Sequence, residues 1–400
     1  MTLPLIVYRS LRQHALSTLV TATSIALACG LLMTVWMVKD QSQRAFADST
    51  TGFDAVLGAR GSKLQLVLNS IFHLEASPGN LAPEDYEAIR RHPAVKTAIP
   101  IAVGDNYQGW RIVGTIPQLF SVEYSKGKSY AVAPGGRQFD PAEREAVIGS
   151  LASERLGLKV GDKFSPYHGI NFDPKAQHEE VYTVTGVLNP TNTPADRVIW
   201  IPLQGVQTMG GHDPKMAGDV SAVLLQFRAP TAGLMLDVMY NKQGNRLTLA
   251  YPVGAVVADL FNKIGWMDKV LALVAYLVAV VAAGSVLASI YASMHARRRD
   301  IAILRALGAR RRTVFGAIVA EAAAIGGLGA LVGYAVYAGL FLLVAGVIRA
   351  QTGVVLELGS MHTVLWAAPL GMAVLGALGG IVPAFKAYRT PVAENLIPAS

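Results

Sequence analysis

Four long stretches of the chain carry almost no charged side chain. They are Ala15–Val38, Val270–Met294, Thr313–Ile348, which only Glu321 interrupts, and Thr363–Phe385. A helix needs about 20 apolar residues to cross a bilayer, and the hydrocarbon offers its backbone no hydrogen-bond partner. The pattern therefore predicts four membrane-spanning helices, one within 1–38 and the others at about 270–294, 313–346 and 363–385.

The first apolar run has a second interpretation, a cleaved signal peptide. The tripeptide Ala45-Phe46-Ala47 matches the small residues of a cleavage site. However, the run is longer than the core of a signal peptide, and charged residues separate it from the tripeptide. A retained anchor is the favoured interpretation.

In the long segment between the first and second apolar runs, apolar and polar residues alternate over short stretches, as they do in a folded domain. Alternating apolar residues predict strands at Val181–Leu188, Arg197–Ile201, Val220–Phe227 and Arg246–Tyr251. The pattern also predicts a helix at Pro83–His92, strands at Val95–Val103 and Glu145–Gly149, and a helix at Leu151–Leu158. We therefore expect a large mixed α/β domain of two lobes at 39–269, inserted between 1–38 and the three helices of 270–400.

One segment early in this domain is amphipathic. Its apolar residues recur at helical spacing and are Leu64, Val67, Leu68, Ile71 and Leu74. A helix of this kind lies at the bilayer surface, where it would gate a lateral entrance for substrate, or packs its apolar face on the domain. The second interpretation is the commoner one for amphipathic helices.

Composition and charge support a membrane protein. Hydrophobic residues make up 52% of the chain and charged residues 16%, against about 25% in soluble domains. The net charge is +8. Three segments next to the spans, Met1–His14, His295–Arg312 and Lys386–Ser400, carry the whole positive excess of +9, and Glu321 subtracts one. Basic residues mark the cytoplasmic side, so both termini are expected there, and membrane topology explains the excess without a nucleic-acid partner.

Three common motifs of nucleotide and hydrolytic chemistry do not occur in the chain. It has no GxxxxGK[ST], GxSxG or HExxH sequence, and its single cysteine, Cys29, excludes an intrachain disulfide. His178 adjoins Glu179 and Glu180, but no second ligand type lies at a familiar spacing, so a solvated loop is favoured over a metal ligand. We expect no catalytic residue, no metal and no cofactor bound by this chain.

The loop between the second and third spans has features that topology alone does not require. Its sequence is MHARRRDIAILRALGARRRTVF, from Met294 to Phe315. The residues Ile301, Leu304 and Leu307 fall on one face of a short helix, which Gly308 can end in a left-handed C-cap. This segment resembles the coupling helix of MacB/FtsX-type ABC transporter permeases, whose pattern is close to RRREIGxLRALGAxRRxV. Asp300 and Ala302 depart mildly from that pattern.

The resemblance extends over much of the chain. It covers Glu145–Gly149 with Leu156–Asp162, Val184–Leu188 with Asp196, Glu321-Ala322 in the third span, and Gly379–Ala384 with Pro391-Val392. The layout of four helices, with a large extracytoplasmic α/β domain inserted after the first, agrees with that family as well.

This resemblance implies a transmembrane subunit of the bacterial inner membrane, multi-pass, with its large domain in the periplasm. A separate cytoplasmic ABC ATPase subunit would bind ATP and Mg²⁺. A second permease copy, giving a homodimer, membrane lipid, and a periplasmic adaptor or lipoprotein are the other expected partners. The implied coupling helix spans about 297–309, and its ATPase-coupling residues are Arg297, Arg298, Arg299, Asp300, Ile301, Leu304, Arg305, Leu307, Gly308 and Ala309.

Small residues mark the expected contacts between helices. Ala22, Ala26 and Gly30 recur at every fourth position, and Gly329/Gly333 and Gly376/Gly380 repeat the spacing. The first set is a candidate dimer interface, with packing inside one subunit as the equal alternative. Glu321 is costly in lipid, so we expect it to form a hydrogen bond within the helix bundle rather than a proton relay.

Three functions compete. The first is ATP-driven export or extraction of a hydrophobic or lipidated substrate from the outer leaflet, driven by mechanotransmission. The second is a signalling permease that moves its external domain to activate a partner and transports nothing. The third, metal or haem export, rests only on scattered histidines. The large external domain favours the first function.

Overall fold

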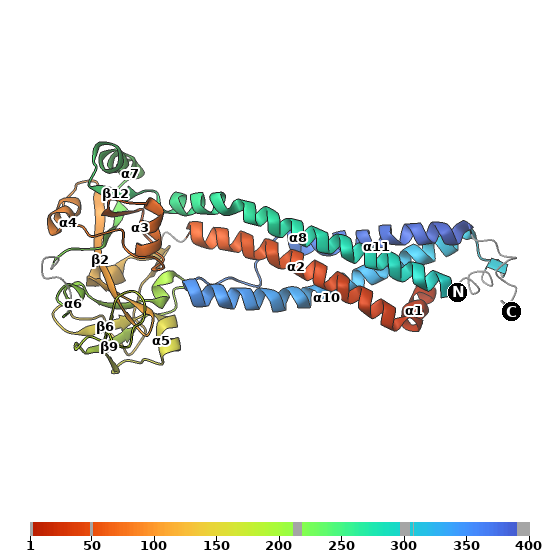
Figure 1. The fold of residues 1–400 in the computed structure, drawn as a ribbon, viewed down its shortest axis with the longest axis horizontal. Helices are drawn as coiled ribbons and strands as arrows, with labels where there is room; N and C mark the ends of the chain where they lie inside the picture. Colours follow the sequence, from red (N-terminus) through yellow and green to blue (C-terminus); the bar gives the residue numbers. More distant parts are fainter. Residues whose placement is uncertain (1–2, 49–50, 211–217, 297–304, 307, 390–400) are drawn as a thin grey trace. The chain divides into compact units, whose positions relative to one another are not determined.

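The structure is a computed structural model that describes residues 3–48, 51–210, 218–296, 305–306 and 308–389. Contacts divide the chain into two compact units (Figure 1). The helical unit holds Met1–Gln41, Gly265–Gly346 and Glu357–Ser400, and the external unit holds Ser42–Ile264 and Val347–Leu356. The end of the third long helix, from Val347, and the short segment that follows it up to Leu356 are therefore part of the external unit.

The described residues form four long helices, which confirms the number of spans that the apolar runs predict. They are α2 (Ala15–Asp48), α8 (Val253–Ala296), α10 (Arg311–Thr352) and α11 (Val364–Arg389), and each is long and apolar enough to cross a bilayer. A separate short helix, α1 (Leu3–Gln13), precedes α2. Helix α8 begins well before the predicted run at 270. The apolar run does not include its first turns, because they carry exposed polar residues such as Asp259 and Lys263, whose side chains pair at 2.7 Å.

The glycines of α10 allow its neighbours to approach its backbone closely. A Cβ added to Gly333 would lie 2.9 Å from the Cβ of Cys29 on α2. On α11, a Cβ added to Gly380 would lie 2.5 Å from the Cβ of Ala322. These separations are too short for any side chain larger than hydrogen, so α2 and α11 both pack tightly on α10.

The candidate dimer stripe of Ala22, Ala26 and Gly30 faces α10 of the same chain. The backbone oxygens of Ala22 and Ala26 lie 2.8 and 3.3 Å from where a Cβ on Gly329 and Gly333 would be. Ala26 and Gly30 are buried, and Ala22 is half-buried. Packing inside one subunit, the alternative interpretation, is what the structure shows at these three positions.

Glu321 has a partner within the helical unit. It lies on α10, and the hydroxyl of Ser10 on α1 donates a hydrogen bond to its carboxylate. Both residues are buried. The predicted hydrogen bond within the helical unit is confirmed, and α1 supplies the donor.

The external unit is built on a ten-stranded mixed sheet with the order β12-β1-β11-β2-β3-β10-β6-β9-β7, to which β8 adds beside β2. The strands are β1 (Ala55–Ala59), β2 (Val95–Tyr107), β3 (Trp110–Thr115), β6 (Glu145–Ile148), β7 (Lys163–Phe164), β8 (Tyr167–His168), β9 (Tyr182–Val187), β10 (Ile199–Pro202), β11 (Ala222–Phe227) and β12 (Leu247–Ala250). Among the described strands, the β3–β10 and β6–β9 pairs are parallel and the others antiparallel. A separate hairpin joins β4 (Glu123–Ser125) and β5 (Lys128–Ser129).

Short helices cover both faces of this sheet. They are α3 (Lys63–Ser70), α4 (Pro83–Arg90), α5 (Ser150–Leu156), α6 (Leu203–Gln207), α7 (Pro230–Asp237), η1 (Pro117–Ser121), η2 (Pro194–Arg197) and the π-helix η4 (Val238–Gln243). The predicted mixed α/β class is confirmed.

The core of the external unit lies in three clusters. One cluster covers one face along most of the sheet, where Val56, Val147 and Trp200 pack against residues of α3, η1 and the start of α8. On the opposite face, α4 and α7 cover one half of the sheet and α5 and α6 the other half. The expected two lobes therefore exist on one face only, because a single sheet runs through both.

We expect Gly333→Val to destabilise the helical unit, because the added side chain must push α2 away from α10. Overpacking of this kind costs about 1–3 kcal/mol. Gly339→Val on the same helix is the matched control, since a Cβ there meets no atom within 4 Å. Thermal unfolding of the purified full-length chain in detergent measures the difference. Equal melting temperatures for the two variants would contradict the close contact.

Candidate functional site

The predicted coupling segment is only partly described. Its residues Arg305, Gly308 and Ala309 are described; the others, Arg297, Arg298, Arg299, Asp300, Ile301, Leu304 and Leu307, lie outside the described residues. Gly308 has a φ of +96°, and its N–H donates to the carbonyl of Arg305 at 3.1 Å. A left-handed turn of the kind that ends helices therefore stands three residues before α10 begins at Arg311.

Two cation–π contacts join the ends of three long helices near this turn. The guanidinium of Arg311 on α10 lies 5.5 Å from the ring centroid of Tyr388 on α11. The ammonium of Lys386 on α11 lies 4.6 Å from the ring centroid of Tyr291 on α8. Contacts of this kind contribute about 0.5–1 kcal/mol at exposed sites. They connect α10, α11 and α8 next to the predicted coupling segment.

The predicted gate residues on and after α3 have different environments. Val67 and Ile71 are buried in the main core cluster and Leu68 packs against it, as the packing interpretation expects. Leu64 is half-buried, and Leu74 is exposed. Leu64 and Leu74 have surface outside the core and are not among the residues that pack in it.

A fully buried residue of α3 falls outside the predicted stripe. Leu66 is 0% exposed, and a Cβ on Gly58 of β1 would overlap its side chain. Helix α3 therefore packs on two sides. Helical spacing identifies a single apolar face and could not identify Leu66, because the burial of Leu66 depends on strand β1, which passes beside the helix.

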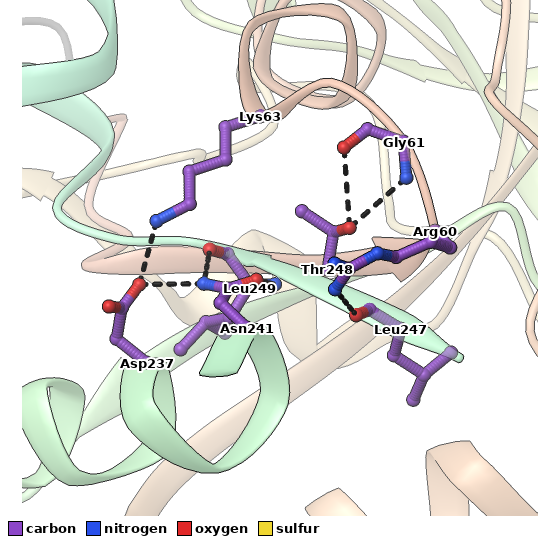
Figure 2. A network of polar contacts seen from close by, with 8 residues as sticks. All are labelled: Arg60, Gly61, Lys63, Asp237, Asn241, Leu247, Thr248 and Leu249. Carbon is purple, nitrogen blue, oxygen red and sulfur yellow. Dashed lines mark hydrogen bonds and ion pairs between the residues drawn. The ribbon is translucent and has the colours of Figure 1, made fainter. Parts of the chain in front are cut away.

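A polar network fastens the start of α3 to β12 and to the segment before it (Figure 2). The ammonium of Lys63 pairs with the carboxylate of Asp237 at 2.7 Å. Asn241 donates to that carboxylate at 2.6 Å, and its amide also exchanges two hydrogen bonds with the backbone of Leu249. The hydroxyl of Thr248 accepts from the N–H of Gly61 at 3.1 Å. Strand β12 leads directly into α8, so the network connects α3 to the strand from which α8 begins.

His73 lies in a buried polar cluster just beyond α3. Its backbone adopts a left-handed φ of +54°, and its ring meets Trp200 edge to face, with centroids 5.5 Å apart. Burial, with the positive charges of Arg111 and Arg197, lowers the pKa of His73 to about 3. A cavity of about 10 Å³ lies between Ser70, His73 and Trp200, space for about one water molecule. The histidine is therefore a neutral part of the core.

The last turn of α10 and Gly353, the residue after it, contact the external unit to which they belong. The guanidinium of Arg197 donates to the carbonyl of Gln351, and Arg349 lies 3.5 Å from the carboxylate of Glu154. A Cβ on Gly353 would lie 2.8 Å from the carbonyl oxygen of Thr193. The C-terminal end of α10 is thus fixed to η2 and α5.

The solvated-loop prediction for His178 is wrong. The His178 side chain is only 6% exposed, and its Nε2 lies 3.2 Å from Oδ1 of the fully buried Asp105. The two residues are far apart in sequence, so no spacing rule connects them. Glu180, the neighbour that suggested a solvated stretch, accepts a hydrogen bond from the N–H of Gly210 at 2.9 Å.

We expect the burial of His73 to make the free energy of unfolding depend on pH. An unfolded histidine has a pKa of about 6.5, so from there down to about pH 3 the unfolded chain binds the extra proton. The free energy of unfolding should fall as the pH falls, by up to about 1.4 kcal/mol per pH unit. Denaturant unfolding of the full chain between about pH 7 and pH 5 measures this slope.

The matched variants for that slope are His73→Gln and His92→Gln. The first removes the buried titrating group and should flatten the slope, whatever its effect on stability at neutral pH. The second removes a histidine outside the cluster and should leave the slope unchanged. A steep slope that survives in His73→Gln would mean that another group is responsible.

Two regions of the chain match families of known proteins. Residues 15–232 match the family described as MacB-like periplasmic core domain, and residues 272–392 match the family described as FtsX-like permease C-terminal. No curated protein matches.

Two solved structures are similar to about half of the chain. The periplasmic region of MacB from Actinobacillus actinomycetemcomitans is 11% identical, with a TM-score of 0.35, and the match covers 53% of this chain and 93% of that one. The extracellular domain of the noncanonic ABC-type transporter YknZ from Gram-positive bacteria is 18% identical, with a TM-score of 0.30, over 48% of this chain and 97% of that one.

Proposed function

This chain belongs to the FtsX-like permeases that carry a MacB-like periplasmic core domain, and from that membership we propose that it exports or extracts a hydrophobic or lipidated substrate by mechanotransmission. The family consists of transmembrane subunits of ABC transporters without an ATPase domain, and such a permease implies an ATPase partner. The chain is a multi-pass membrane protein with four candidate spans.

The observation that carries the proposal is the continuity of α8. Its residues Val253 and Val257 are buried in the core of the external unit, while its residues from Gly265 onward belong to the helical unit. The helix ends at Ala296, next to the segment 297–309. A movement imposed on that segment would act on one uninterrupted helix whose other end is held in the external core.

The driving movement would come from a cytoplasmic ATPase that binds ATP and Mg²⁺. The coupling residues 297–309 would receive it, and the left-handed turn at Gly308, with the contact of Arg311 on Tyr388, would carry it into α10 and α11. In this proposal both termini are cytoplasmic and the large domain is periplasmic, as the distribution of basic residues favours.

Dimerisation with a second copy is part of the proposal. The stripe of Ala22, Ala26 and Gly30 already faces α10, so the surface for the second copy would lie elsewhere. Helix α8 exposes a row of large apolar residues, Leu271, Leu273, Val274, Leu277, Val280 and Val281. Lipid and a second permease are the two environments that suit such a surface. A periplasmic adaptor or lipoprotein remains a proposed additional partner.

We expect Gly308→Val to reduce transmission between the ATPase and the permease. Valine avoids the left-handed conformation of Gly308, at a cost of about 1–3 kcal/mol. The matched control is Gly127→Val in the external unit, because Gly127 also has a positive φ of +73° and open space around it. In proteoliposomes containing the ATPase, permease-dependent ATP turnover should fall several-fold in Gly308→Val only. Wild-type turnover in that variant would contradict the coupling role.

The same preparation separates transport from signalling. Stimulation of ATP turnover by added lipid or lipoprotein supports export or extraction. Absence of any such response, together with binding of an extracytoplasmic enzyme activator, would replace it with the signalling function. Stimulation by haem or a metal ion alone would indicate the third class.

We expect Leu64→Glu and Leu74→Glu to impair substrate handling while the domain stays folded, because both side chains have surface outside the core. Val67→Glu buries a charge in the core and should instead unfold the domain. Substrate-stimulated ATP turnover and thermal unfolding, measured together, distinguish these effects. If Leu64→Glu and Leu74→Glu both retain full stimulation, α3 does not gate substrate.

A further inference from the structure

Three side chains from separate parts of the external unit converge where β8 pairs with β2. Asp105 Oδ1 lies 3.2 Å from Nε2 of His178 and 3.6 Å from Nδ1 of His168. All three potential ligand atoms lie within 4.8 Å of one another. Four ligands around Zn²⁺, with bonds of about 2.0–2.2 Å, are separated by about 3.3–3.6 Å along each edge of the tetrahedron. The two measured separations are close to that range.

The backbone brings the two histidines together before any ion binds. His168 donates its N–H to the carbonyl of Ala176 at 2.7 Å, and His178 donates its N–H to the carbonyl of Pro166 at 2.9 Å. These bonds pair the two ends of the loop 165–178 as antiparallel neighbours. His168 is also the direct cross-strand partner of Asp105 in the pairing of β8 with β2, a position where side chains lie next to each other.

Asn106, the residue after Asp105, holds the same loop. Its amide nitrogen donates to the carbonyls of Gly169 and Asn171 at 2.9 and 3.2 Å. Its amide oxygen accepts from the N–H of Gly109 at 2.9 Å, so both ends of the side chain are engaged. Asn106 is fully buried. The loop that carries the histidines is thus fixed to the strand that carries the carboxylate.

The exposure of the three side chains leaves one side of the cluster open. Asp105 is 0% exposed and His178 6% exposed, whereas His168 is 54% exposed. A buried carboxylate requires a compensating charge or hydrogen bonds, and a divalent cation between two imidazoles and a carboxylate supplies that charge. The exposed side leaves space for water as a fourth ligand.

The geometry points to a zinc site formed by Asp105, His168 and His178. Two imidazole nitrogens and one carboxylate are a donor set that Zn²⁺ takes with a water in the fourth position. Ca²⁺ and Mg²⁺ prefer oxygen ligands and do not suit the two nitrogens. The bound ion would lock the loop 165–178 onto β2. This site is independent of the proposed transport function.

The test uses the full-length chain, purified in detergent with any affinity tag removed and stripped of metal. Titration with Zn²⁺ against a chromophoric chelator should give one tight site per chain. His168→Ala should weaken that site by well over tenfold, because even outer-shell partners of a metal ligand contribute about 10–100-fold. His168 is the variant of choice because its exposed side chain can be removed without opening the core. His92→Ala, which removes a histidine outside the cluster, should bind zinc like the wild type.

Two further measurements separate this site from incidental zinc. Co²⁺ should give the visible absorption of a four-coordinate site in the wild type and in His92→Ala, and not in His168→Ala. Zinc should also slow proteolytic cleavage within 165–178 in the wild type and in His92→Ala, but not in His168→Ala. Equal zinc affinity in the wild type and His168→Ala, or absence of a tight site in the wild type, would overturn the proposal. Neither outcome involves the ATPase, so the proposed function is tested separately.

Discussion

The helical unit depends on how closely two helices approach the backbone of α10. Apolar side chains gain little by leaving lipid for one another, so helices in a membrane associate through close van der Waals contact. Gly333 admits Cys29 of α2 on one side of α10, and Ala322 meets Gly380 of α11 on another. The same helix carries Glu321, whose carboxylate accepts from Ser10 of α1. One helix therefore organises three others within a single subunit.

The external unit depends on a sheet that is covered on both faces. On one face, α3, η1 and the start of α8 share a continuous core with the strands. The buried Val253 and Val257 hold α8 in that core, and the network of Lys63, Asp237 and Asn241 connects α3 to β12, the strand just before α8 (Figure 2). The helix that enters the helical unit is thus held at its start by packing and by hydrogen bonds.

Prediction from sequence succeeded where local pattern decides and failed where distant residues decide. The strands at β9, β10, β11 and β12 and the pairs α4–β2 and β6–α5 follow from alternation and turn residues. Strand β2 continues to Tyr107, beyond its predicted end at Val103, through a bulge. The extension contains Asp105 and Asn106, which pair with β8 and contact the loop 165–178. The same contacts bury His178, which its acidic neighbours made appear solvated.

The gate and dimer hypotheses show the same limit. Helical spacing identified Val67 and Ile71 as one apolar face, but only the strands beside α3 decide which side chains are buried and add Leu66 to them. Spacing identified Ala22, Ala26 and Gly30 as a close contact without naming the partner helix. The structure supplies α10 of the same chain, because the glycines of α10 match that spacing.

The sequence by itself determined the four membrane-spanning helices, the mixed α/β class of the inserted domain and the family, because uncharged length, alternation and a short basic motif are local properties. Only the tertiary structure decided which helices touch, which apolar residues leave the surface, and that Asp105 meets two histidines. Those outcomes depend on residues brought together from distant parts of the chain, and sequence spacing carries no information about such distances.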